Sequence, residues 1–473
     1  MDAGEISNRR NRKRKNVQAV DPVVDSVVDI TLVYQHLHRK KRKFMNAYLI
    51  FVLAVLVGGY LLDLVVSFLE LRSLQPELPT EFRDVYEKEK YRKSQEYTKV
   101  TTGFSLIQET VTLLLTLIFI LAGGFNAVDL LARSVGWGSI STGLLFTGIL
   151  VLLSFVLGLP FSIYSTFVIE ERFGFNKTTA KTFILDLLKG VVLAVLIGGP
   201  LLAAVLWFFE ITGSMAWLYC WLAVTLFTFV LQFLAPVVIM PLFNKFTPLE
   251  DGELKEGITE YAAQQDFAIQ GIYTMDGSKR STRLNAFFTG FGRFRRIVFF
   301  DTLVEKLQPK EIIAVLAHEM GHFKKKHILK MMAASVVQTG LMFFILSLFL
   351  GNEQLFAAFA MEHISVYAGL IFFGFLYAPV SMLLGIFFHI YSRKNEYEAD
   401  AWAVQTTDDQ GEGLINGLKK LSVHNLSNLT PHPLNVFIHY SHPPVLQRIE
   451  AIRQLAEELA EEKESVQQIK QIT

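Results

Sequence analysis

Long apolar runs alternate with shorter polar stretches along most of the chain. About seven of these runs are long enough to cross the roughly 30 Å hydrocarbon core of a bilayer as helices. The expected spans occupy residues 44–68, 104–131, 142–168, 182–209, 215–240, 331–350 and 367–390. The pattern therefore predicts an all-α multi-pass membrane protein with about seven transmembrane helices.

Two polar parts, at residues 243–327 and 392–473, interrupt this pattern. The spans between them, within 328–391, form one hairpin, so both parts must lie on the same face of the membrane. Ahead of them, residues 44–242 are expected to form a five-helix membrane region with a charged connector at 70–101. Residues that are far apart in the sequence can therefore meet in one soluble domain.

Within the first polar part, the spacing of apolar residues changes from helical to strand-like. Residues 252–265 predict a helix, and residues 268–275, 284–289 and 295–300 predict strands, the last two joined by a turn at 290–292. We expect a small α+β domain. An exposed strand edge there is able to bind an extended peptide through its main chain, although a sheet that only packs against a helix fits the pattern equally well.

Composition and charge narrow the classes of function. The chain is 51% hydrophobic and 19% charged, and its formal net charge of +1 does not suit a nucleic-acid partner. The single cysteine, Cys220, lies inside an apolar span. An intramolecular disulfide and a cysteine-rich metal site are therefore excluded.

Residues 1–43 form a polar extension that is predicted to be disordered and carries basic runs at 9–15 and 39–43. By the positive-inside rule, these runs place the N-terminus in the cytoplasm. Seven spans, however, place it on the membrane face opposite the soluble domain. The two indications conflict, and the sequence leaves the orientation of the N-terminus open.

The sequence H-E-M-G-H at 318–322 carries the strongest chemical signal. On a helix, His318 and His322 lie on one face, and Glu319 stands between them in the sequence. Neutral imidazoles can hold Zn²⁺, which lowers the pKa of a water molecule to roughly 7, and a carboxylate can then take the proton. A buried histidine pair without a metal is the structural alternative. The smooth apolar helix around the motif favours the metal site.

A catalytic zinc site needs a third protein ligand. His327 follows His322 by five residues, which on a continuing helix turns it away from the ligand face. A further predicted helix carries Glu396 and Asp400 on one face. Glu396 is the candidate third ligand, and Asp400 is the candidate acceptor for the second N–H of a ligand histidine. A solvated acidic face that includes Glu398 is the alternative.

Five motifs together carry a resemblance to a known family: H-E-M-G-H, N-E-Y-E-A-D at 395–400, S-K-R-S-T-R-L-N-A-F at 278–287, F-V-I-E-E-R-F-G-F-N at 167–176 and H-Y-S-H-P-P at 439–444. From about residue 62 to 455, the chain resembles the type 1 CAAX prenyl proteases, integral-membrane zinc metalloendopeptidases of the gluzincin type. The resemblance implies seven membrane helices around a hydrated chamber, with the zinc site at one end. It also implies an endoprotease that removes the last three residues of prenylated C-a-a-X proteins, and in some members a second upstream cut.

The resemblance implies roles for individual residues. It makes His318, His322 and Glu396 the ligands of one Zn²⁺ per chain. Glu319 becomes the general base, and Asp400 the acid that positions a ligand histidine.

Two further residues match positions of the family that act on the substrate. Asn285 corresponds to a residue of the edge strand that contacts the substrate backbone. His442 corresponds to a residue that stabilises the oxyanion of the tetrahedral intermediate. Without the resemblance, His442 would be interpreted as a turn residue before two prolines.

The expected partners are membrane lipid and the C-terminal peptide of prenylated C-a-a-X proteins, and the oligomeric state is not indicated. The expected location is the endoplasmic reticulum membrane in a eukaryote, or the cytoplasmic membrane in a prokaryote, with the catalytic face in the cytosol. One alternative is an HtpX-like membrane quality-control protease, which has fewer spans and unprenylated substrates. Another is a metal-regulated transporter whose active groups are the intramembrane acids Glu109, Asp186 and Glu210.

Overall fold

The computed structural model describes residues 46–289 and 296–472. In this part of the chain, 7 helices are long and apolar enough to cross a membrane, as the sequence predicts. They are Ala47–Ser73, Lys88–Leu121, Ser139–Glu170, Ala180–Ile211, Gly213–Phe243, His327–Phe349 and Val366–Thr406. The predicted basic extension, 1–43, and the expected turn at 290–292 lie outside the described residues.

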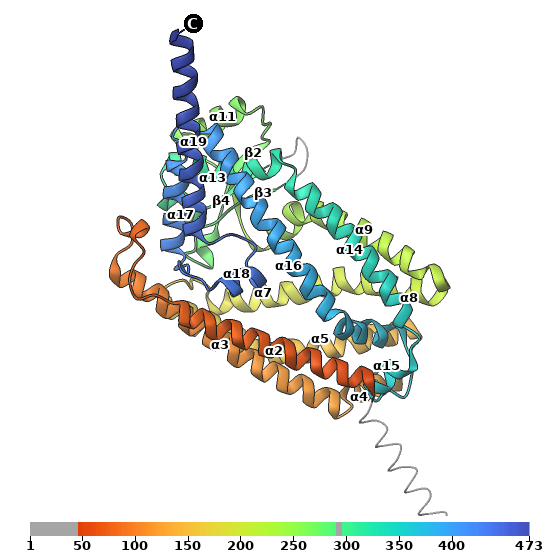
Figure 1. Cartoon of the computed structure of the whole chain (residues 1–473). Helices are drawn as coiled ribbons and strands as arrows, with labels where there is room; N and C mark the ends of the chain where they lie inside the picture. Colours follow the sequence, from red (N-terminus) through yellow and green to blue (C-terminus); the bar gives the residue numbers. More distant parts are fainter. Residues whose placement is uncertain (1–45, 290–295, 473) are drawn as a thin grey trace, which may run out of the picture.

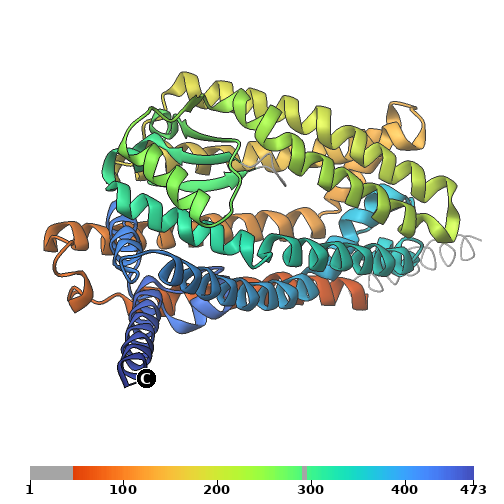
Figure 2. The same cartoon turned by 90° about the horizontal axis from the view of Figure 1, so that it is seen from above.

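The membrane helices lie beside one another, and the soluble domain gathers at one end of them (Figure 1). From above, α14 (His327–Phe349) and α16 (Val366–Thr406) run alongside each other away from this end (Figure 2). The last helix, α19 (Val445–Ile472), projects from the soluble domain with the C-terminus at its tip (Figure 1). The soluble domain is therefore continuous with the membrane helices.

The second membrane helix, α3 (Lys88–Leu121), ends earlier than the predicted span at 104–131. Gly123 interrupts the run, because its φ of 73° lies in the left-handed region that favours glycine. A separate helix, α4 (Gly124–Ser134), follows and buries Phe125 and Val128. The apolar run of the sequence therefore covers one membrane helix and one shorter packed helix.

The small sheet of the soluble domain has 4 strands in the order β1-β2-β4-β3. The three predicted strands are present as β2 (Gly271–Met275), β3 (Ala286–Thr289) and β4 (Arg296–Phe300). The strand β1 (Phe246–Pro248), which pairs antiparallel with β2, was not predicted from the sequence. Because β3 lies at the end of this order, its second edge is not paired with another strand of the sheet. The α+β character of the domain is confirmed.

The sheet shares one apolar core with several helices, among them α13 (Pro309–Lys324), α17 (Glu412–His424) and α19. The core includes Ile297 of β4 and Ile312 of α13, each at most 2% exposed. Burial of such side chains contributes roughly 1.5–3 kcal/mol each relative to exposure. The core therefore holds α13, which carries H-E-M-G-H, in a fixed position.

The helix α16 is 41 residues long and continues from the membrane into the soluble domain. The sequence predicts a span at 367–390 and a separate helix after it, because charged residues begin at Arg393. In the structure, Glu396 and Asp400 lie on the same helix, in the turns that follow the predicted span. The membrane helix itself therefore carries these two acids into the soluble domain.

Close contact between α13 and α16 depends on Gly321. A Cβ atom at this position would lie 2.9 Å from the Cα atom of Ala399 and 3.0 Å from its carbonyl oxygen. Both neighbours are backbone atoms of α16, so they cannot move aside as a flexible side chain would. The absence of a side chain at Gly321 allows the two helices to approach this closely.

Replacement of Gly321 by alanine is expected to push α13 and α16 apart. We expect a lower Tm in detergent and about a tenfold weaker metal affinity, because the two helices carry different candidate metal-binding residues. Gly385→Ala is the matched control, since Gly385 lies on α16 with open space around its Cβ position. Equal behaviour of the two variants in thermal unfolding and metal titration would contradict the role of this contact.

Candidate metal centre

The two histidines of H-E-M-G-H face each other on α13. Pro309 stands in its first turn, and Gln308 caps the helix reciprocally with Glu311. The Nε2 atoms of His318 and His322 lie 3.2 Å apart. His318 is 7% exposed, so burial restricts which groups can approach it.

The structure brings Glu396 to this pair, as the sequence hypothesis expects. Its Oε2 atom lies 3.5 Å from Nε2 of His318, and its Oε1 atom lies 3.3 Å from Nε2 of His322. One ligand atom from each of the three residues falls within 4.8 Å of the others. Two imidazole nitrogens and one carboxylate oxygen therefore converge on one point.

The donor set fits a metal ion. Oε2 of Glu396 is buried and meets no hydrogen-bond geometry among the described residues, although Nη1 of Arg448 lies 3.4 Å from it and Nε2 of His318 lies 3.5 Å from it. A buried carboxylate oxygen without a partner costs free energy unless a cation compensates it. Two nitrogens and one oxygen are ligands of the kind found in catalytic Zn²⁺ sites. The residues of this centre thus suit a zinc ion.

Asp400 lies behind His318. Its Oδ1 atom is 2.7 Å from Nδ1 of His318, so the N–H on this nitrogen donates to the carboxylate and leaves Nε2 for a metal. Burial lowers the pKa of His318, but the hydrogen bonds to Asp400 and Glu396 outweigh burial and raise the pKa to about 9. Without a metal, a proton therefore occupies the site, and metal binding must release it.

Arg448 completes this buried cluster, and the sequence analysis missed it. Its Nε atom donates to Oδ2 of Asp400 at 2.8 Å, and its Nη2 atom donates to Oδ1 at 2.6 Å. Burial lowers the pKa of Arg448, but Asp400, Glu396 and Glu319 raise it by a larger amount. The guanidinium therefore stays charged and compensates the charge of the buried carboxylates.

A signal for Arg448 was present in the sequence. The first turns of α19 carry a stripe of apolar residues that includes Val445, Ile449 and Ile452. Arg448 lies three residues after Val445 and four before Ile452, on the same face. A charged side chain on the buried face of a helix indicates a buried partner of opposite charge.

His327 is not one of the three converging residues, as the sequence predicts, but its contact with His322 was not predicted, because a continuing helix was expected there. In the structure α13 ends at Lys324, and Lys326 has a φ of 58°, in the left-handed region. The chain turns there before α14 begins at His327. The His327 ring thereby reaches the His322 ring, and the two Nδ1 atoms lie 3.0 Å apart.

Glu319 and His442 belong to the surroundings of the three converging residues. Glu319 is half-buried on α13, between the two histidines in sequence. His442 belongs to the loop between α18 (Pro433–His439) and α19, and its Nε2 atom is 3.4 Å from Oε1 of Glu396. Its side chain is 65% exposed, so a substrate is able to reach it.

Asn285 lies at the residue before β3, at the start of the unpaired edge. The side chain of Asn425 accepts from the backbone N–H of Leu284 at 3.0 Å and donates to its carbonyl at 3.2 Å. Nearby, Arg283 pairs with Glu170 of a membrane helix at 3.1 Å. The segment that leads into the edge strand is therefore fixed on both sides.

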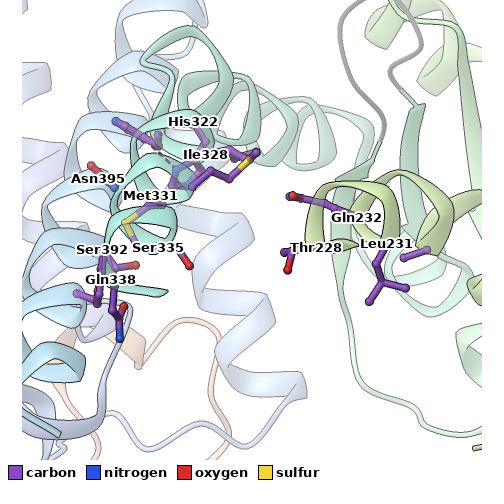
Figure 3. Close-up of a pocket in the computed structure, with 14 residues that line it drawn as sticks. Thr228, Leu231, Gln232, His322, Ile328, Met331, Ser335, Gln338, Ser392 and Asn395 are labelled. Atoms are coloured by element: carbon purple, nitrogen blue, oxygen red, sulfur yellow. Dashed lines mark hydrogen bonds between the residues drawn. The ribbon is translucent and has the colours of Figure 1, made fainter. Parts of the chain in front are cut away.

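An apolar cleft opens beside His322 (Figure 3). Its volume is about 700 Å³. Thr228, Leu231 and Gln232 line one side of it, whereas Met331 lines the side next to His322 (Figure 3). The cleft therefore lies between α9 (Ala216–Leu234) and α14, and it connects the ligands with the membrane region.

The intramembrane acids have separate surroundings. Asp186 accepts from Nε of Arg280 at 2.8 Å and from its Nη2 at 3.0 Å. Glu210 accepts from the hydroxyl of Ser139 at 2.5 Å. Glu109 lines a polar cavity of about 330 Å³ that is bounded by α2 (Ala47–Ser73), α3 and α18. The three acids thus belong to different parts of the fold.

Two family models match the chain. Residues 67–245 match the model described as CAAX prenyl protease N-terminal, five membrane helices. Residues 248–456 match the model of peptidase family M48. The membrane region and the soluble domain are therefore both covered by these matches.

Curated proteins resemble the chain over most of its length. It is 36% identical over 398 residues to the CAAX prenyl protease 1 homolog of Arabidopsis thaliana, a match that covers 82% of this chain and 93% of that protein. It is 36% identical over 425 residues to CAAX prenyl protease 1 of Saccharomyces cerevisiae, with 83% and 92% covered. For the Homo sapiens homolog, the identity is 33% over 425 residues, with 80% and 88% covered.

A solved structure shares this fold. The crystal structure of S. mikatae Ste24p superposes with a TM-score of 0.82 at 32% sequence identity. The match covers 86% of this chain and 99% of that chain. The arrangement of membrane helices and soluble domain is thus common to both.

Proposed function

The chain belongs to the CAAX prenyl protease family, whose catalytic part is an M48 peptidase, and from this premise we propose that it is a zinc endopeptidase that removes the last three residues of prenylated C-a-a-X proteins. Family membership makes it a metalloprotease of the membrane. The observation that carries the finer proposal is the convergence of His318, His322 and Glu396 beside an apolar cleft. We assign the three residues as the ligands of one zinc ion.

The remaining residues act on water and on the peptide. His318, His322 and Glu396 would hold the zinc ion, which would supply Lewis acidity for the activation of water and the polarisation of the peptide carbonyl. Glu319 accepts the proton of the attacking water, and later passes it to the leaving amine. His442 donates a hydrogen bond to the carbonyl oxygen as negative charge develops on it. The free edge of β3, which starts after Asn285, holds the peptide in extended form through main-chain hydrogen bonds.

The cleft next to His322 supports a lipid-modified substrate (Figure 3). The cysteine that carries the isoprenoid precedes the scissile bond, so its side chain must lie close to the metal ligands. A volume of about 700 Å³ lies within the range of roughly 300–1,000 Å³ that is typical of small-molecule sites. We assign this cleft to the isoprenoid chain, with the membrane lipid on its open side.

Cleavage of a matched peptide pair tests this function. Purified full-length protein in detergent receives farnesylated and unmodified forms of one C-a-a-X peptide, and mass spectrometry locates the cut. We expect metal-dependent release of the last three residues from the farnesylated peptide. A chelator and Glu319→Ala should each abolish this release.

The other outcomes point to the alternatives. Equal cleavage of both peptides would support an HtpX-like protease and overturn the prenyl preference. Solute movement that survives Glu319→Ala, without cleavage of either peptide, would support a transporter. The ion pair of Asp186 with Arg280 argues against the latter, because it neutralises one of the acids that a transporter would use. In a eukaryote we propose the endoplasmic reticulum membrane with this centre on the cytosolic face, which protease access to a tag at the end of α19 in intact microsomes would test.

A polar substitution in the cleft should discriminate between the two peptides. We expect Met331→Gln to raise the KM for the farnesylated peptide about fivefold, roughly 1 kcal/mol of lost apolar contact. The unmodified peptide should show no change. Val466→Gln is the control, since Val466 is 44% exposed on α19, outside the membrane helices. An equal rise of KM for both peptides would remove the lipid assignment of the cleft.

A further inference from the structure

We propose that His327 and Glu398 are positioning residues that hold the metal ligand His322 in the tautomer and orientation that bind the ion. The inference rests on the proposed metal site and adds a hydrogen-bonded chain on its second histidine. The chain runs from the carboxylate of Glu398 through the ring of His327 to the ring of His322.

The contacts of this chain are short and largely buried. His327 is 2% exposed. Its Nε2 atom lies 3.0 Å from Oε2 of Glu398, and its Nδ1 atom lies 3.0 Å from Nδ1 of His322. The side chain of Glu398 is 35% exposed, so this chain of hydrogen bonds ends at the protein surface.

The hydrogen-bonding capacity of each group determines where the protons lie. An ionised carboxylate can only accept, so Nε2 of His327 must carry the proton of the contact with Glu398. In a neutral imidazole the other nitrogen is then bare, and Nδ1 of His327 accepts from Nδ1–H of His322. Neutral His322 consequently has a bare Nε2. This nitrogen faces Glu396 and His318, where the metal would lie.

The opposite tautomer of His327 would defeat metal binding. A proton on its Nδ1 would force His322 to accept there, and a neutral His322 would then carry its own proton on Nε2. A protonated Nε2 offers no lone pair to a metal. The carboxylate of Glu398, which fixes the tautomer of His327, is therefore as important for metal binding as the His327 ring itself.

The two ligand histidines are thus oriented by different means. His318 donates directly to the carboxylate of Asp400, which Arg448 compensates. His322 donates to a neutral imidazole, and the carboxylate lies one ring further away. The Asp400 arm is buried, whereas the Glu398 arm reaches the surface. The arrangement orients both rings while placing only one of the two positioning carboxylates in the buried cluster.

Two substitutions of His327 separate acceptor chemistry from packing. His327→Asn places an amide oxygen where Nδ1 stood, so it still accepts from His322. His327→Phe keeps a ring but removes the acceptor. We expect the Phe variant to bind Zn²⁺ about 10- to 100-fold more weakly, and the Asn variant to stay within about threefold of the original protein. Leu329→Ala is the control, since Leu329 is exposed on the same helix.

Metal affinity is measured on the full-length protein in detergent by competition with a coloured chelator, without substrate. The visible absorption of Co²⁺-loaded protein gives a second readout, because it reports the number and kind of ligands. We expect an altered Co²⁺ spectrum in the Phe variant only. Glu398→Ala should weaken the affinity in the same direction by a smaller factor.

The outcomes distinguish this inference from the proposed function. Unchanged Zn²⁺ affinity and Co²⁺ spectrum in His327→Phe would overturn the inference while the metal site stands. Equal loss in the Asn and Phe variants would also overturn it, because packing alone would then explain the effect. Failure of the unsubstituted protein to bind Zn²⁺ would overturn the proposed function and the inference together.

Discussion

Glu319→Gln is expected to lower kcat by about 10²–10⁴-fold while Zn²⁺ binding stays within about threefold of the original. The amide keeps the size and hydrogen-bonding reach of the carboxylate, but it cannot accept a proton from water at neutral pH. Glu319 is not among the three residues whose ligand atoms converge. Loss of its charge should therefore affect proton transfer far more than metal binding.

The measurement pairs turnover of a farnesylated peptide with metal titration of the same sample. Glu305→Gln provides a control, because Glu305 is an exposed carboxylate of α12 (Asp301–Lys306) that pairs with Lys306. It should leave both quantities unchanged. Retention of more than about a tenth of the turnover in Glu319→Gln would show that another group accepts the proton.

The spacing of residues along single helices explains why the sequence alone predicted the two histidines and two acids of this centre. The period of a helix places His318 and His322 on one face without any tertiary information. The same rule applies to Glu396 and Asp400, and the hairpin of membrane spans brings the two pairs to one side. The seven membrane helices follow in the same way from the length of apolar runs. Short-range regularities of this kind are visible in a single sequence.

The missed features depend on events that no local period describes. His327 reaches His322 because the backbone leaves the helix at Lys326, a left-handed residue that is not glycine. Nothing in the three consecutive lysines before His327 indicates such a turn. Arg448 is 48 residues from Asp400 in sequence, so their contact is visible only once α19 is packed on α16. Tertiary packing decided both positions.

Two ion pairs that α19 makes differ in their exposure to solvent. Arg448 has a side chain that is 10% exposed, and it pairs with the 3%-exposed carboxylate of Asp400. Arg453, on the same helix, is 46% exposed and pairs with Glu81, which also contacts Lys419. Solvent screens the charges of the exposed pair, Arg453 with Glu81, but it screens those of the buried pair, Arg448 with Asp400, far less. Substitution of each arginine of α19 therefore tests how burial changes the effect of losing an Arg–carboxylate pair.

Arg448→Leu is expected to destabilise the soluble domain by about 3–5 kcal/mol, because the buried carboxylates of Asp400 and Glu396 lose the guanidinium that both of them contact. We also expect Zn²⁺ to bind about 10- to 100-fold more weakly, since the carboxylate that orients His318 loses its own support. Thermal unfolding in detergent and chelator competition measure the two effects. Arg453→Leu should change stability by no more than about 1 kcal/mol and leave the metal affinity intact.

A double variant separates charge compensation from orientation of the histidine. Asp400→Asn combined with Arg448→Leu removes both charges of this ion pair and leaves the carboxylate of Glu396, so we expect it to recover part of the stability that Arg448→Leu loses. The amide oxygen that replaces the Asp400 carboxylate would still accept from Nδ1–H of His318, but as a neutral and weaker acceptor. Metal affinity should therefore stay below that of the original protein although stability returns. Recovery of both quantities together would show that Asp400 contributes charge alone and does not orient the ligand.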